Sequence, residues 1–279
     1  MLDNLKILWH QGKQFIPDVT SATVPGVFRG RPVITRVKVD EDELAALCPV
    51  KAISVSPVSI DLGRCTFCGE CAFCFPQKIS FTKDYKIATN IRERLIVREG
   101  MAGKEGLTGK EGIINKDGMI NKDGMGGRIT VGKERVRKEI RALLNKSLKL
   151  RQVSAGGDNS CELELNAANN VQFDMSRFGI DFVASPRHAD GIVITGPVSK
   201  NMAEALQICY DAVPEPKIIV LAGTDAISGG IFEAINSGIP DVTTQLDRTF
   251  IDEHHIDLYI PGNPPHPLTI INGLLDLVR

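Results

Sequence analysis

A run of cysteines constrains this chain more than any other feature of its sequence. Residues 63–76 read GRCTFCGECAFCFP, and Cys65, Cys68 and Cys71 within it follow a C-x2-C-x2-C spacing. Thiolates at this spacing hold three corners of a cubane iron-sulfur cluster and leave one iron for a fourth ligand. The position of that fourth thiolate decides how the surrounding chain must fold.

The fourth ligand is predicted from the pattern of bacterial-type ferredoxins, in which a cysteine before a proline serves the other cluster of a two-cluster protein. Here Phe75 stands at that position after the run, whereas the corresponding cysteine of the first half is kept as Cys48, before Pro49. The three cysteines expected ahead of Cys48 are replaced by Lys38, Glu41 and Leu44. One cluster has therefore lost all its ligands, and we expect one 4Fe-4S cluster on Cys48, Cys65, Cys68 and Cys71.

Other assignments of these cysteines remain open. Cys74 is an alternative fourth ligand, but it lies one residue out of register. The whole set could instead form a zinc ribbon or a disulfide knot. Zinc sites usually bring two separated C-x2-C pairs rather than a close triple, which favours the cluster. Four of the seven cysteines fall within ten residues, a distribution typical of a reducing compartment.

Length and composition indicate a globular protein of two domains. The chain has 279 residues, of which 24% are charged and 43% apolar. The formal net charge is -1, so no overall basic field points to nucleic acid. We find neither an apolar run of about 18 residues nor the apolar core of a signal peptide, and we expect a cytoplasmic protein that does not span the membrane.

Residues 1–98 are predicted to form an N-terminal arm and an α+β ferredoxin-like domain. A short amphipathic helix ends near Gly12, and its apolar face would pack on its own domain, on a partner subunit or on a membrane surface. An extended arm follows over 20–31. Alternating and apolar stretches then predict strands at 32–40, 52–55, 58–61, 78–81 and 86–88, with a helix at 41–47 that delivers Cys48.

Residues 99–132 are predicted to be a linker or insertion. Four six-residue units, GKEGLT, GKEGII, NKDGMI and NKDGMG, occupy 103–126. Their regular glycines favour turns over helix, so we expect a surface insertion or tether. The acidic positions do not match an EF-hand calcium loop.

A basic helix is predicted at 133–150. Residues 128–151 contain nine Lys or Arg against two Glu. Such a face is usually solvated, while contact with an acidic partner or an anionic bilayer is an alternative. Nucleic acid is less favoured and we expect none, because no aromatic side chain interleaves with the charges.

Residues 133–279 are predicted to form an α/β domain with a small parallel, flavodoxin-like sheet. Short continuous apolar runs at 191–195 and 217–221 are typical of strands covered on both faces. A helix at 200–213 between them implies a right-handed crossover. A further strand at 257–260 and a helix at 267–278 follow. Ligands should then bind at the loops after the strands, at 196–197, 222–230 and 261–267.

Three stretches of this domain carry a family resemblance: FGIDFVASPRHADGIVITGPVS, PEPKIIVLAGTDAISGGIF and DLYIPGNPPHPLTIINGLL. They resemble the 20 kDa electron-transfer subunit of respiratory complex I and, more closely, the small subunit of membrane-bound, energy-converting nickel-iron hydrogenases, over about 148–278. The resemblance implies a large partner subunit, further complex subunits and quinone at the subunit interface. It also implies a place on the cytoplasmic face of a membrane. The SPRHAD segment at 185–190 keeps the form that lies near the large subunit in relatives.

The same resemblance implies a second cluster site, which this chain has largely lost. The family's four cysteine positions fall on Asp158, Cys161, Asp225 and Asn263. Oxygen ligands suit iron-sulfide chemistry poorly, so we expect a degenerate site without a second cluster. An emptied polar pocket and a single ion on Asp158, Cys161 and Asp225 both remain open.

Two functions are compatible with these features. The first is an electron-transfer subunit of a complex I-like or hydrogenase-like oxidoreductase complex, with one working cluster. The second is a structural or regulatory paralogue whose second domain scaffolds such a complex without relaying electrons. No Walker lysine, dinucleotide fingerprint or nucleophile triad is present, so we expect no complete active site in this chain alone.

Overall fold

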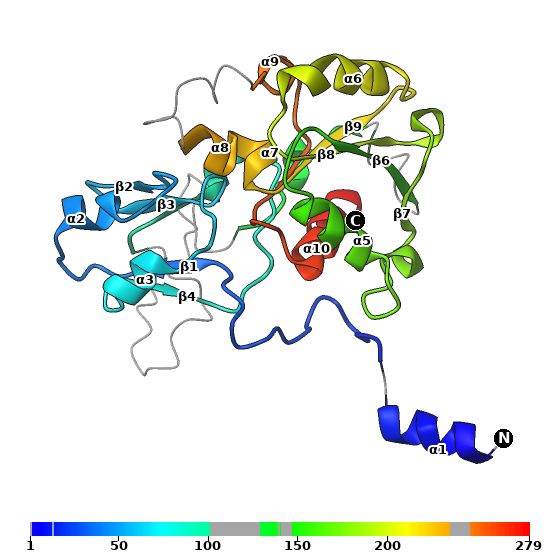
Figure 1. Ribbon diagram of the computed structural model, residues 1–279, viewed down its shortest axis with the longest axis horizontal. Helices are drawn as coiled ribbons and strands as arrows, with labels where there is room; N and C mark the ends of the chain where they lie inside the picture. The colour runs from blue at the N-terminus through cyan, green and yellow to red at the C-terminus, as the bar shows by residue number, and fades with distance from the viewer. Residues whose placement is uncertain (1, 13, 101–128, 139, 141–146, 235–245) are drawn as a thin grey trace.

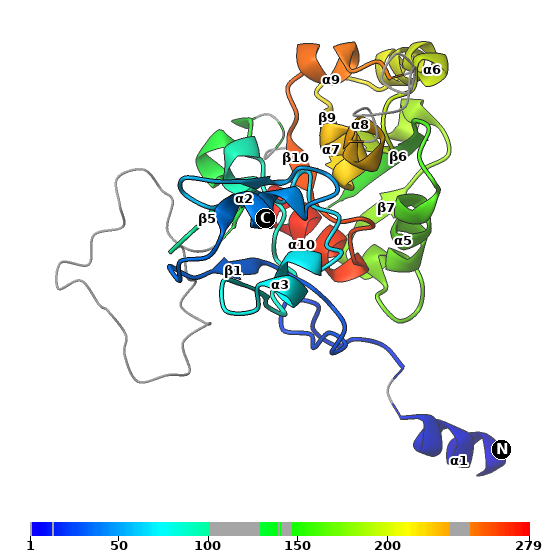
Figure 2. The ribbon, with the colours of Figure 1, turned by 60° about the vertical axis from the view of Figure 1, so that its left-hand side comes forward.

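The computed structural model describes residues 2–12, 14–100, 129–138, 140, 147–234 and 246–279. Two regions lie side by side, an N-terminal region with small antiparallel sheets and a second region built on a parallel sheet (Figures 1 and 2). The predicted repeats at 103–126 lie outside the described residues. Among the helices of the described part, none has the length and apolar character needed to cross a membrane.

The predicted N-terminal helix is confirmed as α1 (Leu2–Gln11), which projects away from the rest of the chain (Figure 1). Its residues Leu5, Leu8 and Trp9 are 58%, 63% and 90% exposed. The expectation that this apolar face packs on its own domain is therefore wrong.

The N-terminal region contains two antiparallel sheets. One pairs β1 (Pro32–Ile34) with β4 (Ile79–Phe81), and the other has the order β2 (Ile53–Ser54), β3 (Ser59–Asp61), β5 (Ile96–Arg98). Two short helices, α2 (Glu41–Ala46) and α3 (Glu70–Cys74), lie beside them. The Asp40 carboxylate caps α2 by accepting from the Glu43 amide. An α+β arrangement is present, while the ferredoxin-like assignment stays a prediction.

The strand predicted at 86–88 is wrong. Ile87 and Ala88 are buried without joining a sheet, and Thr89 forms an isolated antiparallel bridge with Tyr259 of the second region. The third strand of the second sheet is instead β5, which pairs with β3. The apolar run at 86–88 is thus explained by burial between the two regions.

The second region is a five-stranded parallel sheet. Its order is β10 (Leu258–Ile260), β9 (Ile218–Ala222), β8 (Gly191–Thr195), β6 (Leu148–Ser154), β7 (Ile180–Phe182). Every pairing is parallel. Read from β7, this is the order 2-1-3-4-5 of flavodoxin-like sheets, which confirms the predicted α/β class.

Helices cover both faces of this sheet. Val193 points to the side of α5 (Ser160–Ala168) and α10 (Pro267–Val278), whereas Ile192 and Ile194 point to the side of α6 (Lys200–Asp211) and α9 (Thr249–Glu253). Burial of alternate residues on opposite faces explains the continuous apolar run of β8.

The prediction of a basic helix at 133–150 is wrong at both ends of that range. Residues 133–135 form a 3-10 turn, and β6 begins at Leu148. Leu148 and Leu150 are fully buried, whereas Lys149 between them is exposed. This period of two is that of a strand, and pairing with both β7 and β8 satisfies its backbone. Part of the stretch lies outside the described residues.

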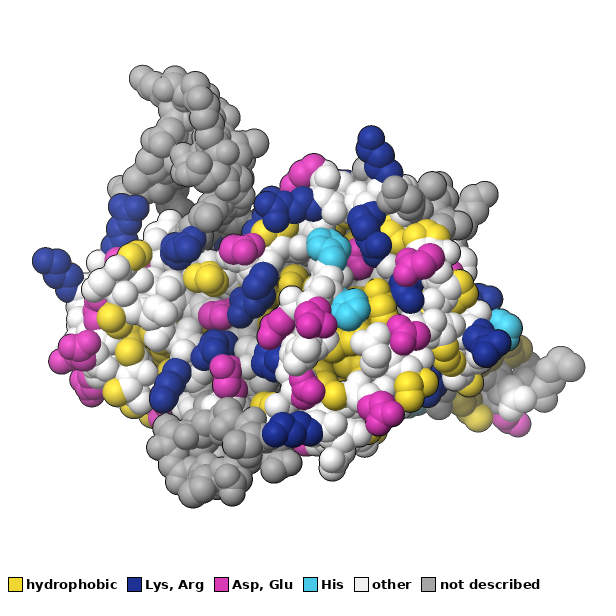
Figure 3. Space-filling view, turned by 90° about the horizontal axis from the view of Figure 1, so that it is seen from above, with side chains coloured by type: hydrophobic (Ala, Val, Ile, Leu, Met, Phe, Trp, Pro, Cys, Tyr) yellow, Lys and Arg dark blue, Asp and Glu magenta, His cyan; other side chains and the backbone are white. Residues whose placement is uncertain are grey.

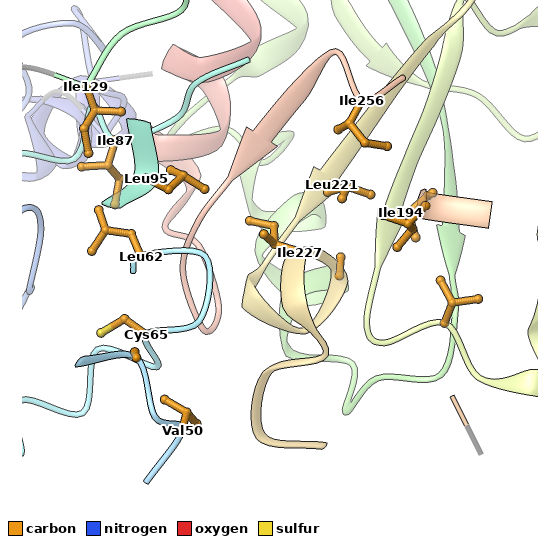
Figure 4. Packing of buried hydrophobic residues seen from close by; sticks show 14 of the residues in the cluster. Val50, Leu62, Cys65, Ile87, Leu95, Ile129, Ile194, Leu221, Ile227 and Ile256 are labelled. Carbon is orange, nitrogen blue, oxygen red and sulfur yellow. The ribbon is translucent and has the colours of Figure 1, made fainter. Parts of the chain in front are cut away.

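The two regions share one hydrophobic cluster. Figure 4 shows Leu62 and Cys65 of the N-terminal region in the same cluster as Leu221 and Ile227 of the second. A β-carbon on Gly63 would lie 2.9 Å from Ile227 Cγ2, so the backbone of Gly63 packs closely against the Ile227 side chain. We call the contact of residues 63–65 with α7 (Thr224–Ser228) the junction. An ion pair between Arg64 and Glu233, 2.9 Å long, flanks it.

Charges are mixed on the surface. Figure 3 shows lysine and arginine side chains interspersed with aspartate and glutamate on the face seen from above. This mixture agrees with the near-neutral net charge of the sequence.

Candidate metal centre

The structure brings the four predicted cysteines to one pocket. Cys48 follows α2, Cys65 follows β3, and Cys68 and Cys71 lie just before and inside α3. All four line a pocket that holds about 340 Å³ of space outside atoms, part of it open to solvent. Residues far apart in the sequence, Ile53, Ile60 and Phe81, complete its apolar wall.

Backbone amides point at two of the sulfurs. The Ala52 amide donates to Cys48 Sγ at 3.2 Å, and the Phe67 amide donates to Cys65 Sγ at 3.3 Å. Such bonds stabilise a thiolate and tune the potential of a cluster bound to it. The pocket therefore supplies both ligands and the polar support that these ligands require.

The four thiols also influence one another electrostatically. Burial raises the pKa of Cys65 to about 12, with the neighbouring cysteines as a further cause. Burial likewise raises the pKa of Cys71 to about 11, with Cys68 and Cys48 contributing. Four thiolates in this pocket would be unstable on their own, and a cationic metal core would remove the repulsion. The donor set thus fits a metal cluster.

Cys74 lies outside this pocket. It is exposed, and its thiol donates to Glu70 Oε1 at 3.7 Å. In the described part of the chain, no three His, Cys, Asp or Glu side chains converge closely enough to hold a single metal ion.

The loop that carries Cys65 is held by a pair that the sequence did not reveal. The Arg92 guanidinium binds both carboxylate oxygens of Asp61, at 2.8 and 2.6 Å. Asp61 in turn accepts from the Gly63 amide through its side chain and from the Cys65 amide through its carbonyl. No signal in the sequence links Asp61 to Arg92, which lies 31 residues away.

The four positions of the degenerate second site also gather at one place, the carboxyl edge of the parallel sheet. Asp158 follows β6, Cys161 is the second residue of α5, Asp225 lies in α7 after β9, and Asn263 follows β10. A β-carbon on Gly223 would lie 2.4 Å from Cys161 Sγ. The Thr224 amide donates to the Gly262 carbonyl at 2.9 Å. The loops after three strands therefore meet, as expected for a ligand site in this fold.

In this second site Cys161 and Asp225 are buried, whereas Asp158 is exposed. Burial raises the pKa of Asp225 from its ordinary 3.8 to about 6, and the nearby carboxylates of Asp158 and Glu162 add to the shift. Burial also raises the pKa of Cys161 to about 12, with Asp225 as the next cause. Asp225 Oδ1 has no hydrogen-bond partner among the described residues. The single-ion alternative lacks the required convergence of ligands among these residues.

Glu162 also belongs to this site, although the sequence did not predict it. It is 5% exposed, and its Oε1 accepts from Ser154 Oγ at 2.5 Å and from Thr195 Oγ1 at 2.6 Å. Ser154 and Thr195 end the adjacent strands β6 and β8. The polar residues at the carboxyl ends of these two strands were the sequence signal that could have indicated a polar partner such as Glu162.

Comparison with known proteins addresses the second region. The family model for the NADH ubiquinone oxidoreductase 20 kDa subunit matches residues 159–277. A probable membrane-bound hydrogenase subunit mbhJ of Pyrococcus furiosus is 35% identical over 123 residues, which are 44% of this chain and 69% of that protein. The chain belongs to the NADH ubiquinone oxidoreductase 20 kDa subunit family.

Two further proteins are similar to this chain over part of its length. An NADH-quinone oxidoreductase subunit from Citrifermentans bemidjiense is 40% identical over 117 residues, and the chain spans 64% of its length. A chain from the structure of the membrane-bound sulfane sulfur reductase, an archaeal respiratory membrane complex, has a TM-score of 0.41 and 26% identity over 50% of this chain and 73% of its own. The matched family range includes Cys161, Asp225 and Asn263 and excludes the four cysteines of the pocket.

Proposed function

We propose that this chain is an iron-sulfur electron-transfer subunit of a complex I-like or hydrogenase-like oxidoreductase complex. The observation that carries the proposal is the pocket lined by Cys48, Cys65, Cys68 and Cys71. Membership of the 20 kDa subunit family supports the assignment to such a complex.

The four thiolates would hold one 4Fe-4S cluster, which supplies reversible one-electron storage when bound. A cubane spreads its ligands over four corners, so the thiols need not converge on one point as they must around zinc. The chain's own residues exclude water from Cys65, which is 8% exposed, and direct amide donors at Cys48 and Cys65.

The second region would dock a large partner subunit and carry no cluster of its own. Three of the four positions implied by the resemblance are oxygen or amide side chains, and Asp225 is a buried acid there. Arg187 and His188 of the SPRHAD segment are exposed and available for such a contact. We place the docked chain on the cytoplasmic face of a membrane, with quinone at the subunit interface.

A second function is favoured by the same loss of ligands. A paralogue that scaffolds a complex without relaying electrons through its second domain would need only the retained fold. Purification with native partners separates the two. A redox-active assembly with a hydrogenase-like large subunit supports the first, and a stable monomer supports the second.

Metal and sulfide quantitation with EPR of the dithionite-reduced, anaerobically purified full chain tests the proposal. We expect about four irons per chain and a single reduced cluster signal. The Cys48→Ser variant should lose most of its iron, whereas Cys74→Ser should keep it. About eight irons per chain would contradict the loss of the second cluster. A colourless protein with stoichiometric zinc, or iron loss in Cys74→Ser alone, would contradict the assigned ligands.

A further inference from the structure

Arg29 lies against the loop that carries the predicted cluster ligands. Its Nη1 donates to the Phe67 carbonyl at 3.2 Å. A β-carbon on Gly69 would lie 2.5 Å from Arg29 Nε. Gly69 lines the cysteine pocket and has a φ of +85°, which favours glycine, so the guanidinium packs against a wall position that has no side chain.

Phe67 connects Arg29 to a ligand sulfur. The carbonyl of Phe67 accepts from Arg29, and the amide of the same residue donates to Cys65 Sγ at 3.3 Å. Phe67 has a φ of +55°, which is uncommon for an aromatic residue and needs support from its surroundings. The hydrogen bond from Arg29 provides that support from outside the pocket.

The N-terminal arm holds Arg29 in place. Val19 is buried, and its carbonyl accepts from Tyr85 Oη at 3.0 Å and from Asn272 Nδ2 at 2.9 Å. Further along, Lys83 Nζ donates to the Phe28 carbonyl at 2.7 Å. The ring of Phe28 packs edge-on against His266, with centroids 5.4 Å apart. The arm is therefore fixed on both regions before it reaches the cysteine loop.

We propose that Arg29 is a positioning residue that raises the reduction potential of the cluster on Cys48, Cys65, Cys68 and Cys71. This inference rests on the proposed function. By binding the Phe67 carbonyl, Arg29 keeps the Phe67 amide directed at Cys65 Sγ. A hydrogen bond from an amide to a ligand sulfur favours the reduced cluster. The guanidinium charge acts in the same direction, because reduction adds negative charge beside it.

The test is an EPR-monitored redox titration of the full chain, with iron counted in every sample. Arg29→Gln should keep its iron and shift the midpoint potential to a more negative value. Arg29→Lys keeps the charge but loses the planar donor pair, so its shift should be smaller. Arg36→Gln is the matched control, since Arg36 is also exposed and also covers a glycine of positive φ, Gly100, away from the pocket. Its midpoint should equal that of the wild type.

Each outcome decides the inference. An Arg29→Gln midpoint equal to those of the wild type and Arg36→Gln overturns it. If Arg29→Gln loses its iron while Arg29→Lys keeps it, the midpoint of Arg29→Lys must be more negative than that of the wild type, and an equal midpoint overturns the inference. Equal iron loss in Arg29→Gln and Arg36→Gln overturns it as a general loss of stability. A wild-type protein without iron overturns the proposed function and this inference together, whereas an unshifted midpoint in an iron-loaded variant overturns the inference alone.

Discussion

At the scale of single residues, the second site shows two ways of keeping a carboxyl group out of water. Glu162 is compensated by the hydroxyls of Ser154 and Thr195. Asp225 Oδ1 has no such partner among the described residues. The Asp225 carboxyl has one hydrogen bond with the Ile231 backbone. Since a buried carboxylate with an unpaired oxygen is costly, the two acids should respond differently to mutation and to pH.

Glu162→Ala should destabilise the fold by about 1–3 kcal/mol, because it leaves the buried Thr195 hydroxyl without its closest acceptor and also removes the acceptor of the exposed Ser154 hydroxyl. The measurement is the free energy of unfolding from urea titration followed by circular dichroism. Glu253→Ala, at an exposed position, is the control and should change it by less than about 0.5 kcal/mol. Equal effects of the two substitutions would show that Glu162 does not brace the ends of β6 and β8.

Asp225→Asn should become progressively more stable than the wild type as the pH rises from about 4 to about 6. The folded-state pKa of Asp225 is raised to about 6, so its stabilising contribution is complete below the unfolded value of 3.8 and is lost as the pH rises through 6. The difference should reach on the order of 2 kcal/mol. Urea titrations across this pH range measure it. A difference independent of pH would contradict the shifted pKa.

At the scale of elements, the sequence predicted best where one local pattern determined the outcome. β8 and α10 have the predicted bounds, because a continuous apolar run and an apolar helix that begins at a proline are local signals. The predicted helix at 133–150 includes the first three residues of β6, because the basic residues masked the alternation of Leu148 and Leu150. β5 and β7, each three residues long, were not predicted.

In the candidate site, too, the features with a local sequence pattern were predicted and the long-range contacts were not. Spacing predicted three of the four cysteines that line the pocket, and the cysteine-proline pattern of bacterial-type ferredoxins predicted Cys48. The residues that hold the cysteine loop in place could not be predicted from the sequence. Arg29 reaches Phe67 across 38 residues, and Arg92 reaches Asp61 across 31. Such contacts depend on the tertiary fold and leave no periodic trace in the sequence.

Lys78 offers a test of how the strands of the N-terminal region are joined. It precedes β4, its side chain is 2% exposed, and its Nζ binds Glu99 Oε2 and the Val37 carbonyl, each at 2.9 Å. Lys78→Ala should lower the free energy of unfolding by about 3–5 kcal/mol, because it leaves the partly buried Glu99 carboxylate without its ion-pair partner.

The exposed Lys38→Ala serves as its control and should be near neutral. A Lys78→Met/Glu99→Leu double variant should recover much of the loss, because it removes both charges together. Thermal unfolding of all three proteins is the measurement. A double variant no more stable than Lys78→Ala would place the loss in packing rather than in the ion pair.

At the scale of the whole molecule, the two regions are bound by a common core and by the junction. Leu62 and Cys65 belong to the same hydrophobic cluster as Ile227 and Leu221. The N-terminal arm also connects the two regions, through the contacts of Val19 and Phe28. We therefore expect the two regions to unfold together rather than as independent domains.

Gly63→Val should weaken that coupling. The added side chain would meet Ile227 Cγ2 and the Arg92 guanidinium, both within 3 Å of a new β-carbon, and should cost about 1–3 kcal/mol. Unfolding in urea should become less cooperative, and limited proteolysis should cleave between the regions sooner. Gly26→Val is the control, because no heavy atom lies within 4 Å of its added β-carbon. Cooperative unfolding of Gly63→Val with unchanged stability would contradict a tight junction.

The exposure of α1 has a consequence for spectroscopy. The chain has a single tryptophan, Trp9, which lies on this helix and is 90% exposed to solvent. Its fluorescence should have a long-wavelength maximum and be quenched efficiently by acrylamide, and it should hardly change while the cores melt. For the same reason, a blue shift on mixing the protein with another component would report contact at α1. The molecule thus carries an intrinsic optical reporter for its N-terminal helix.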